Sequence, residues 1–143
     1  MFQRHVLWTR VLADRRTVLP GGAAGDLLEY ARREREVLVL KPSRGYGGEG
    51  VLLGQTATQS AWEGALDTAL ADTELWVVQR LGQIPVVEVP TLTTDGVLEP
   101  ATFYHVMGFA SAPEGLAILA RASQRQVVNV AQRGGMCAVM LAG

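Results

Sequence analysis

The sequence has little of several features that mark particular classes of protein. Cys137 is the only cysteine, which excludes an intrachain disulfide and a cysteine-based zinc site. A reducing compartment, the cytoplasm, is therefore expected. The apolar runs are far shorter than the roughly 20 residues of a membrane helix. Residues 1–20 carry charges throughout and lack the apolar centre of a signal peptide. The sequence thus predicts a cytoplasmic protein without a membrane partner.

An excess of charge of either sign is also absent. Thirteen basic and 14 acidic residues give a formal net charge of −1. The basic residues in 32–36 alternate with glutamates, which is typical of a solvated face. This balance gives no strongly basic surface of the kind that binds nucleic acid, so a nucleic-acid partner is not expected. His5 and His105 stand apart from other metal-ligating residue types, which favours core or surface roles for both.

What remains is the pattern of a globular α+β protein, with 48% hydrophobic residues in a chain of single-domain length, 1–143. One helix is predicted over about 27–36, capped by Asp26, and a second within residues 56–73, capped by Thr58 or by Ser60 in a capping box with Glu63. One face of each helix is apolar, comprising Leu27, Leu28 and Ala31 in the first and Trp62, Leu66, Ala69 and Leu70 in the second. Residues 19–25 are predicted to be a loop.

Short apolar runs predict strands, with a hairpin turn at Asp95-Gly96. These runs are residues 37–40, 51–53, 75–81, 85–89, 91–94, 101–109, 116–123 and 137–142. The strands come in series instead of alternating with helices. We therefore expect two main helices packed on a mostly antiparallel sheet, with the strand at 75–81 in its centre.

A glycine-rich loop lies between two predicted strands in "VLVLKPSRGYGGEGVLLG", residues 37–54. Its glycines are Gly45, Gly47, Gly48 and Gly50. A dinucleotide-binding loop is followed by a helix, but this loop is followed by a predicted strand. A Walker A loop ends in Gly-Lys-Ser/Thr, which is absent here. Lys41 ends an apolar run, where its ammonium group needs a partner. A phosphate fits, because glycines let backbone N–H groups approach it as well. The alternative is a flexible hairpin turn with a surface lysine.

Two further segments carry candidate residues. In "RASQRQVVNVAQRGG", residues 121–135, Arg121 offers a planar fork for phosphate oxygens, and the Asn129 carbonyl could ligate Mg²⁺ or bind a phosphate-bridging water. In "LWVVQRL", residues 75–81, the polar end of the strand can offer its backbone to an adenine edge. Taken alone, these segments are equally compatible with a surface arginine, a turn asparagine and a core strand.

In series, these segments resemble the C-terminal half of the circularly permuted ATP-grasp proteins, the relatives of glutathionylspermidine synthase. The matching stretches, in order, are "LWTR" at 7–10, "LVLKPSRGYGGEGVLLG" at 38–54, "AWEGAL" at 61–66, "WVVQRL" at 76–81 and "ARASQRQVVNVAQRGGM" at 120–136. The resemblance implies an ATP-grasp-like fold and a carboxylate–amine ligase acting through an acyl phosphate, with ATP and Mg²⁺ as cofactors. Its partners would be a nucleotide and small-molecule or peptide carboxylate and amine substrates.

The resemblance also implies roles for individual residues. Lys41 would touch the nucleotide phosphates, the loop with Tyr46 would close over them, and Arg121 would neutralise the transferring phosphoryl group. The strand end would lie along adenine, and Asn129 would line the site. The residues implied in nucleotide binding are Lys41, Gly45, Tyr46, Gly47, Gly48, Gly50, Gln79, Arg80, Leu81 and Asn129.

The sequence departs from the family pattern at three points. Arg80 replaces a glutamate, "QRGG" replaces a glycine triplet, and the acidic Mg²⁺ ligands are implied to precede this segment. We therefore expect residues 1–143 to be part of a larger enzyme and the isolated chain to be inactive. A homo-oligomer is expected, because the missing half of the cleft would leave apolar surface exposed. The alternative is a degenerate, non-catalytic module used for protein association.

Overall fold

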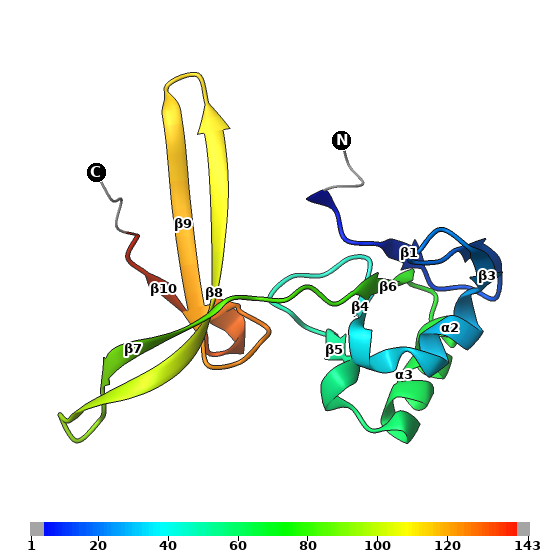
Figure 1. Cartoon of the computed structure of the whole chain (residues 1–143), viewed down its shortest axis with the longest axis horizontal. Coiled ribbons are helices and arrows are strands. Elements are labelled where there is room, and N and C mark those ends of the chain that lie inside the picture. The colour runs from blue at the N-terminus through cyan, green and yellow to red at the C-terminus, as the bar shows by residue number, and fades with distance from the viewer. Residues whose placement is uncertain (1–4, 140–143) are drawn as a thin grey trace. The chain divides into compact units, whose positions relative to one another are not determined.

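A computed structural model describes residues 5–139, and contacts within it divide the chain into two compact units. Unit 1 is residues 1–82 and unit 2 is residues 83–143. Two lobes of one domain would separate in the same way, so the expectation of one domain over 1–143 stays a prediction. The described strands pair antiparallel, and the described α-helices lie in unit 1, which confirms the α+β class (Figure 1). None of the helices within residues 5–139 is long and apolar enough to cross a membrane.

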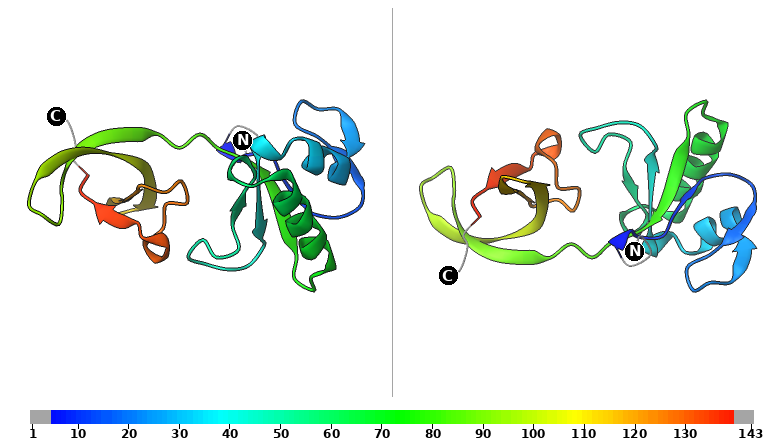
Figure 2. Two further views of the ribbon diagram at one scale, coloured as in Figure 1. Left: turned by 90° about the horizontal axis from the view of Figure 1, so that it is seen from below. Right: turned by 90° about the horizontal axis from the view of Figure 1, so that it is seen from above.

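Unit 1 is a small sheet covered on one face by helices (Figure 2). The strand order in the sheet is β1-β6-β4-β5, and the pair β2–β3 stands apart from it. The strand prediction at 75–81 is confirmed as the central strand β6. The elements are β1 (Thr9–Val11), β2 (Arg16–Val18), β3 (Ala24–Asp26), α2 (Leu27–Arg33), the 3₁₀-helix η1 (Arg35–Val37), β4 (Leu38–Pro42), β5 (Leu52–Leu53), the 3₁₀-helix η2 (Gly54–Thr56), α3 (Gln59–Ala71) and β6 (Trp76–Arg80).

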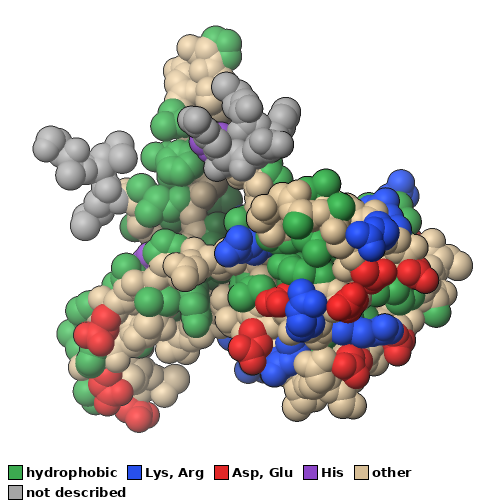
Figure 3. Space-filling model, turned by 45° about the vertical axis from the view of Figure 1, so that its right-hand side comes forward, with side chains coloured by type: hydrophobic (Ala, Val, Ile, Leu, Met, Phe, Trp, Pro, Cys, Tyr) green, Lys and Arg blue, Asp and Glu red, His purple; other side chains and the backbone are tan. Residues whose placement is uncertain are grey.

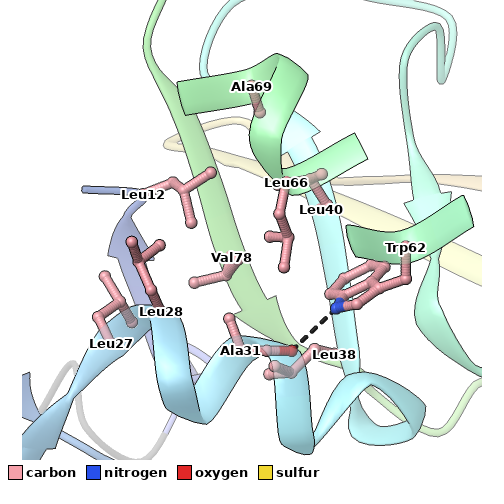
Figure 4. Packing of buried hydrophobic residues seen from close by; sticks show 10 residues of the cluster. All are labelled: Leu12, Leu27, Leu28, Ala31, Leu38, Leu40, Trp62, Leu66, Ala69 and Val78. Atoms are coloured by element: carbon pink, nitrogen blue, oxygen red, sulfur yellow. Dashed lines mark hydrogen bonds between the residues drawn. The ribbon is translucent and has the colours of Figure 1, made fainter. Parts of the chain in front are cut away.

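The core of unit 1 lies between the two helices and the sheet. Alternation along β4 and β6 turns Leu38, Leu40 and Val78 toward the helices, and all three are buried. Trp62 from α3 is the largest fully buried side chain, and its indole N–H donates to the Ala31 carbonyl at 2.8 Å (Figure 4). The complete cluster is Leu12, Leu27, Leu28, Ala31, Leu38, Leu40, Trp62, Leu66, Ala69 and Val78.

The caps and faces of both helices follow local sequence signals, with two exceptions. Asp26 caps α2 as predicted, its carboxylate accepting the Glu29 N–H at 2.8 Å. Thr58, not Ser60, caps α3 by accepting the Ala61 N–H at 3.2 Å. The capping box of Ser60 and Glu63 is therefore wrong, because Ser60 already lies inside the helix. Leu70 also lies off the buried face, since it is exposed.

Three short strands in the first 26 residues were missed. β1, β2 and β3 each contain three residues, too few to establish a period in the sequence. The predicted loop at 19–25 is therefore shorter than expected, because Ala24 and Gly25 pair with Val18 and Thr17. The turn between these strands contains Gly21 and Gly22, both at positive φ.

Asp72 links the end of α3 to the start of β6. Its carboxylate accepts the Glu74 backbone N–H at 3.0 Å and the Trp76 indole N–H at 2.9 Å. These hydrogen bonds hold the pKa of Asp72 below its ordinary value, with the Glu74 N–H as the largest cause.

We expect the melting temperature of the Asp72→Ala variant to lie below that of the wild type near neutral pH. Because the pKa is lower in the folded state, the carboxylate stabilises the fold above the unfolded-state pKa, and this effect fades as the pH falls through the folded pKa. The difference in melting temperature should therefore shrink between about pH 6 and about pH 2. A difference that stays constant over this range contradicts the assignment.

Unit 2 is an antiparallel sheet with the strand order β10-β9-β8-β7. Its long strand β8 pairs with β7 along its first half and with β9 along its second, and the sheet bends between the two halves (Figure 1). The elements are β7 (Val86–Leu92), β8 (Leu98–Ala112), β9 (Gly115–Ser123), the 3₁₀-helix η3 (Val130–Gln132) and β10 (Gly135–Cys137).

The strand predictions in unit 2 are confirmed with changed bounds. The predicted strands at 85–89 and 91–94 are one strand, β7, because Pro90 occupies a pairing position in it without ending it. The turn at Asp95-Gly96 is present, with the Gly96 N–H donating to the Thr93 carbonyl at 3.0 Å. β10 begins before the run predicted at 137–142, and residues 140–142 lie outside the described part of the chain.

Candidate functional site

Lys41 belongs to a polar chain on the face of the unit 1 sheet that the helices do not cover. Its ammonium nitrogen donates to Gln79 Oε1 at 2.8 Å, and Gln79 Nε2 donates to Thr9 Oγ1 at 2.9 Å. Strand register produces this arrangement, because Gln79 lies opposite both Thr9 and Val39. Thr9 in turn donates to the Leu7 carbonyl at 2.9 Å. The three side chains thus hold one another in place on three neighbouring strands.

The Lys41 ammonium group has donor capacity left over. A lysine carries three N–H donors, and one of them is directed at Gln79. Gln79 is neutral, and no ion pair of Lys41 occurs within the described residues. Lys41 is also the only lysine in the sequence. An anion could therefore bind at this nitrogen without displacing a carboxylate.

The glycine-rich loop adopts a conformation that favours glycine at every one of its four glycine positions. Their φ angles are +137° at Gly45, +73° at Gly47, +76° at Gly48 and +71° at Gly50. Other residues rarely adopt such angles. A further restriction applies at Gly50, where a Cβ atom would lie 3.1 Å from Pro42.

The loop and Lys41 line one small hollow of about 220 Å³. Its lining residues are Lys41, Pro42, Ser43, Arg44, Gly45, Tyr46, Gly48, Glu49 and Val51. The predicted association of the lysine with the loop is thus present in the structure. Arg44 adds a second cation that the sequence reasoning missed, although it lies inside the quoted motif. Tyr46 is 91% exposed, so it does not shield the hairpin and is free to contact a ligand.

Arg80 lies on the other face of the same strand. Val78 and Arg80 share the helix-facing side of β6, whereas Gln79 points the opposite way. Arg80 is close enough to Tyr30 to influence its ionisation: burial and then Glu34 raise the pKa of Tyr30, and the charge of Arg80 partly opposes them. The Arg80 side chain therefore does not join Lys41 and Gln79.

The backbone N–H groups at the end of β6 already donate hydrogen bonds within unit 1. The Arg80 N–H donates to the Trp8 carbonyl and the Leu81 N–H to the Val37 carbonyl, both at 2.8 Å. An adenine lying along this strand end would therefore have to be read by backbone carbonyls or by side chains. Thr9, in the motif "LWTR", was not singled out from the sequence because only strand pairing brings it to Gln79.

Arg121 lies in the middle of the unit 2 sheet. It pairs with Val106 on β8 and with Met136 on β10, so apolar residues flank its side chain. Its Nε atom is buried and has no hydrogen-bond partner within the described part of the chain. An unsatisfied buried donor costs about 1–3 kcal/mol. A bound anion would remove this cost, which keeps Arg121 a candidate for phosphate.

Asn129 has a structural role in unit 2. Its side-chain oxygen accepts the Ala131 N–H at 3.0 Å and caps η3. Its backbone carbonyl accepts the Gly134 N–H at 2.8 Å, and a Cβ atom at Gly134 would lie 2.7 Å from that carbonyl oxygen. Ligation of Mg²⁺ by Asn129 would have to use the remaining lone pair of the side-chain oxygen.

The candidate residues thus fall into two sets. Lys41, the loop and Gln79 form one site in unit 1, whereas Arg121 and Asn129 belong to unit 2. Within residues 5–139, no three His, Cys, Asp or Glu side chains gather closely enough to hold a metal ion. The described residues therefore do not provide a carboxylate-based Mg²⁺ site. Comparison with protein-family models, curated proteins and solved structures found no match to this chain.

Proposed function

We propose that unit 1 binds the phosphate groups of a nucleotide, with Lys41 and the glycine-rich loop as the binding elements. The observation that carries the proposal is the Lys41 ammonium group, held by Gln79 on the wall of a hollow formed by that loop. Lysine is a compact cation suited to phosphate, and backbone N–H groups of a glycine-rich loop complement it. The Gln79–Thr9 contact keeps the lysine in place, which lowers the entropy lost on binding.

The family resemblance extends this proposal to a reaction. The chain would serve as the ATP-binding part of a carboxylate–amine ligase of the permuted ATP-grasp type. In that reaction a substrate carboxylate oxygen attacks the γ-phosphorus and ADP leaves, after which the amine displaces phosphate from the acyl phosphate. Lys41 would hold the phosphates, and Arg121 would neutralise the charge on the transferring group. The substrate carboxylate and amine are left open by the proposal.

The alternative function is a non-catalytic module used for protein association. The position of Arg80 on the face opposite Lys41 favours it, because a ligand on the Lys41 face gains nothing from that side chain. The sparse core of unit 2 favours it as well, since Ala120 and Ser123 are the only buried residues among those that the structure describes in this unit. Measuring nucleotide binding separates the two functions.

We expect ATP to bind the chain and the Lys41→Ala variant to bind it at least tenfold more weakly. A charge-assisted hydrogen bond contributes about 1.5–3 kcal/mol, which corresponds to about a 10- to 150-fold change in Kd. Calorimetric titration with ATP, with and without Mg²⁺, measures the change. Arg16→Ala is the matched control, because it removes one positive charge from β2, away from the hollow.

The same titration includes a variant that keeps the charge. Lys41→Arg should restore part of the affinity if the ammonium acts through its charge. Equal binding by wild type and a folded Lys41→Ala variant contradicts the phosphate site. A folded wild type that does not bind ATP at millimolar concentration supports the association module instead.

A further inference from the structure

Within the described residues of unit 2, the outer half of the β8–β9 hairpin is a two-stranded arm with no further strand paired to either edge. β7 pairs with β8 only as far as Tyr104, and β10 pairs with β9 only from Ala120 onward. Residues 107–119 therefore pair only with each other among the described strands (Figure 1). A two-stranded hairpin alone in water is marginally stable. A further strand paired to either edge would therefore stabilise the arm.

The arm is apolar on its surface. Its sequence, "MGFASAPEGLAIL", contains one charged residue, Glu114, located in the turn. Phe109 is 65% exposed, Leu116 61%, Met107 53% and Leu119 50%. Charged side chains lie mainly over unit 1 in the view of Figure 3, and hydrophobic side chains follow the arm. Natural edge strands normally carry lysine, an inward charge or a bulge that prevents pairing with another chain, and residues 107–112 on β8 have none of these.

The free edge of β8 has a defined set of hydrogen-bonding groups. The His105 N–H points away from β9, because it donates to the Pro85 carbonyl at 3.1 Å. Backbone groups alternate in direction along an antiparallel strand. The N–H and C=O groups of Met107, Phe109 and Ser111 therefore point outward as well, toward an edge that no described strand occupies.

We propose that this edge pairs with the same edge of a second copy of the chain, across a two-fold axis at Phe109. Antiparallel pairing of a strand with itself is self-complementary, as a two-fold axis requires. With Phe109 opposite its mate, Met107 lies opposite Ser111 of the other copy, and all outward groups meet in about six hydrogen bonds. The two Phe109 rings form a cross-strand aromatic pair. The two Glu114 side chains lie at opposite ends of the joined arms, so they do not repel each other.

The second copy is the occupant that the composition and the self-complementary edge of the arm favour. The arm offers a partner no charge except Glu114, so a charged peptide or a nucleic acid gains nothing from it. Met107 and Phe109, the half-exposed apolar side chains on the pairing strand, supply on the order of 100 Å² each. Two copies with their backbone edges therefore bury about 500–700 Å², which is in the range of a weak, transient interface. A dimer with a dissociation constant of roughly 100 μM is expected. This proposal does not depend on nucleotide binding by unit 1.

Sedimentation equilibrium over about 1–500 μM protein tests the proposal. The wild type should pass from monomer to dimer, and Phe109→Lys should raise the dissociation constant at least tenfold, because two like charges meet at the axis. Ser111→Pro should do the same without charge, since it removes an outward N–H and leaves the β8–β9 ladder intact. Ala117→Lys is the control: it places the same charge on β9, and its dissociation constant should stay within threefold of the wild-type value.

A disulfide experiment tests the position of the axis and does not depend on the lysine and proline variants. In a Cys137→Ser background, the Phe109→Cys chain should oxidise to a covalent dimer, because paired Cα atoms lie about 5.5 Å apart. The Ala117→Cys chain should not, because three strand spacings of about 4.8 Å separate this position from its mate. A wild type that stays monomeric at about 500 μM overturns the proposal. So does a dimer that both Phe109→Lys and Ser111→Pro leave unchanged, or an Ala117→Cys chain that cross-links as readily as the Phe109→Cys chain.

Discussion

Replacing Trp62 with alanine is expected to lower the free energy of unfolding of unit 1 by about 3–5 kcal/mol. Trp62 is the largest fully buried side chain of the core, and alanine would leave a large cavity between the helices and the sheet. Domains of this kind are stable by only about 5–15 kcal/mol. The substitution therefore removes a large share of the stability of unit 1.

Trp62 also satisfies a backbone group that α2 leaves open. The last four carbonyls of a helix have no partner within the helix, and Ala31 lies in the last turn of α2, which ends at Arg33. The Trp62 indole N–H donates to the Ala31 carbonyl at 2.8 Å. Trp62→Phe retains most of the ring but loses this donor, so we expect it to cost about 1–3 kcal/mol.

Urea unfolding followed by tryptophan fluorescence measures both variants. All three tryptophans lie in unit 1, so Trp8 and Trp76 still report its unfolding after Trp62 is replaced. Leu70→Ala is the matched control, because Leu70 lies on the same helix but is exposed. It should cost less than about 1 kcal/mol. A Trp62→Ala variant no less stable than Leu70→Ala would show that Trp62 does not organise the core.

Gly54→Ala is the second substitution with a large expected effect, about 3 kcal/mol or more. Gly54 is the last residue of the motif "YGGEGVLLG", and it is buried at the start of η2. A Cβ atom there would overlap the Arg35 carbonyl group and lie 3.1 Å from the Leu38 carbonyl oxygen. Both neighbours are backbone, so no side chain can move aside.

The close approach at Gly54 belongs to a contact in which side-chain hydrogen bonds join η1 to η2. The Arg35 Nη1 atom donates to the Gly54 carbonyl at 2.6 Å and to the Ala57 carbonyl at 2.7 Å. Separating the two 3₁₀-helices to admit a methyl group would stretch these hydrogen bonds and shift β5. Gly54 is thus required for space, whereas the four loop glycines are favoured by their φ angles.

Gly64→Ala provides the control for this prediction. Gly64 is an exposed residue within α3, and a Cβ atom there would meet nothing within 4 Å. Alanine is preferred over glycine inside a helix, so this variant should be more stable by about 0.5–1 kcal/mol. Urea midpoints should therefore move in opposite directions for the two substitutions. Equal, small shifts would contradict the close packing at Gly54.

The features of unit 1 that were predicted correctly depend on residues close together in the sequence. Asp26 lies three residues before the N–H that it accepts, and the apolar spacing in α3 identifies Trp62, Leu66 and Ala69 as buried. The hairpin of β4 and β5 follows from two apolar runs around a glycine-rich loop. Caps, helical spacing and turn glycines act within a few residues, so the sequence alone determines them.

The tertiary structure decided which side chains meet. Lys41 and Gln79 are 38 residues apart, and Gln79 and Thr9 are 70 apart, so only the register of β1, β4 and β6 brings them together. The same register places Arg80 on the opposite face, because a shift of one residue along a strand reverses the direction of a side chain. The two-stranded arm at 107–119 likewise depends on where β7 and β10 stop pairing with β8 and β9. Strand pairing joins residues that are distant in the sequence, and local patterns do not encode its register.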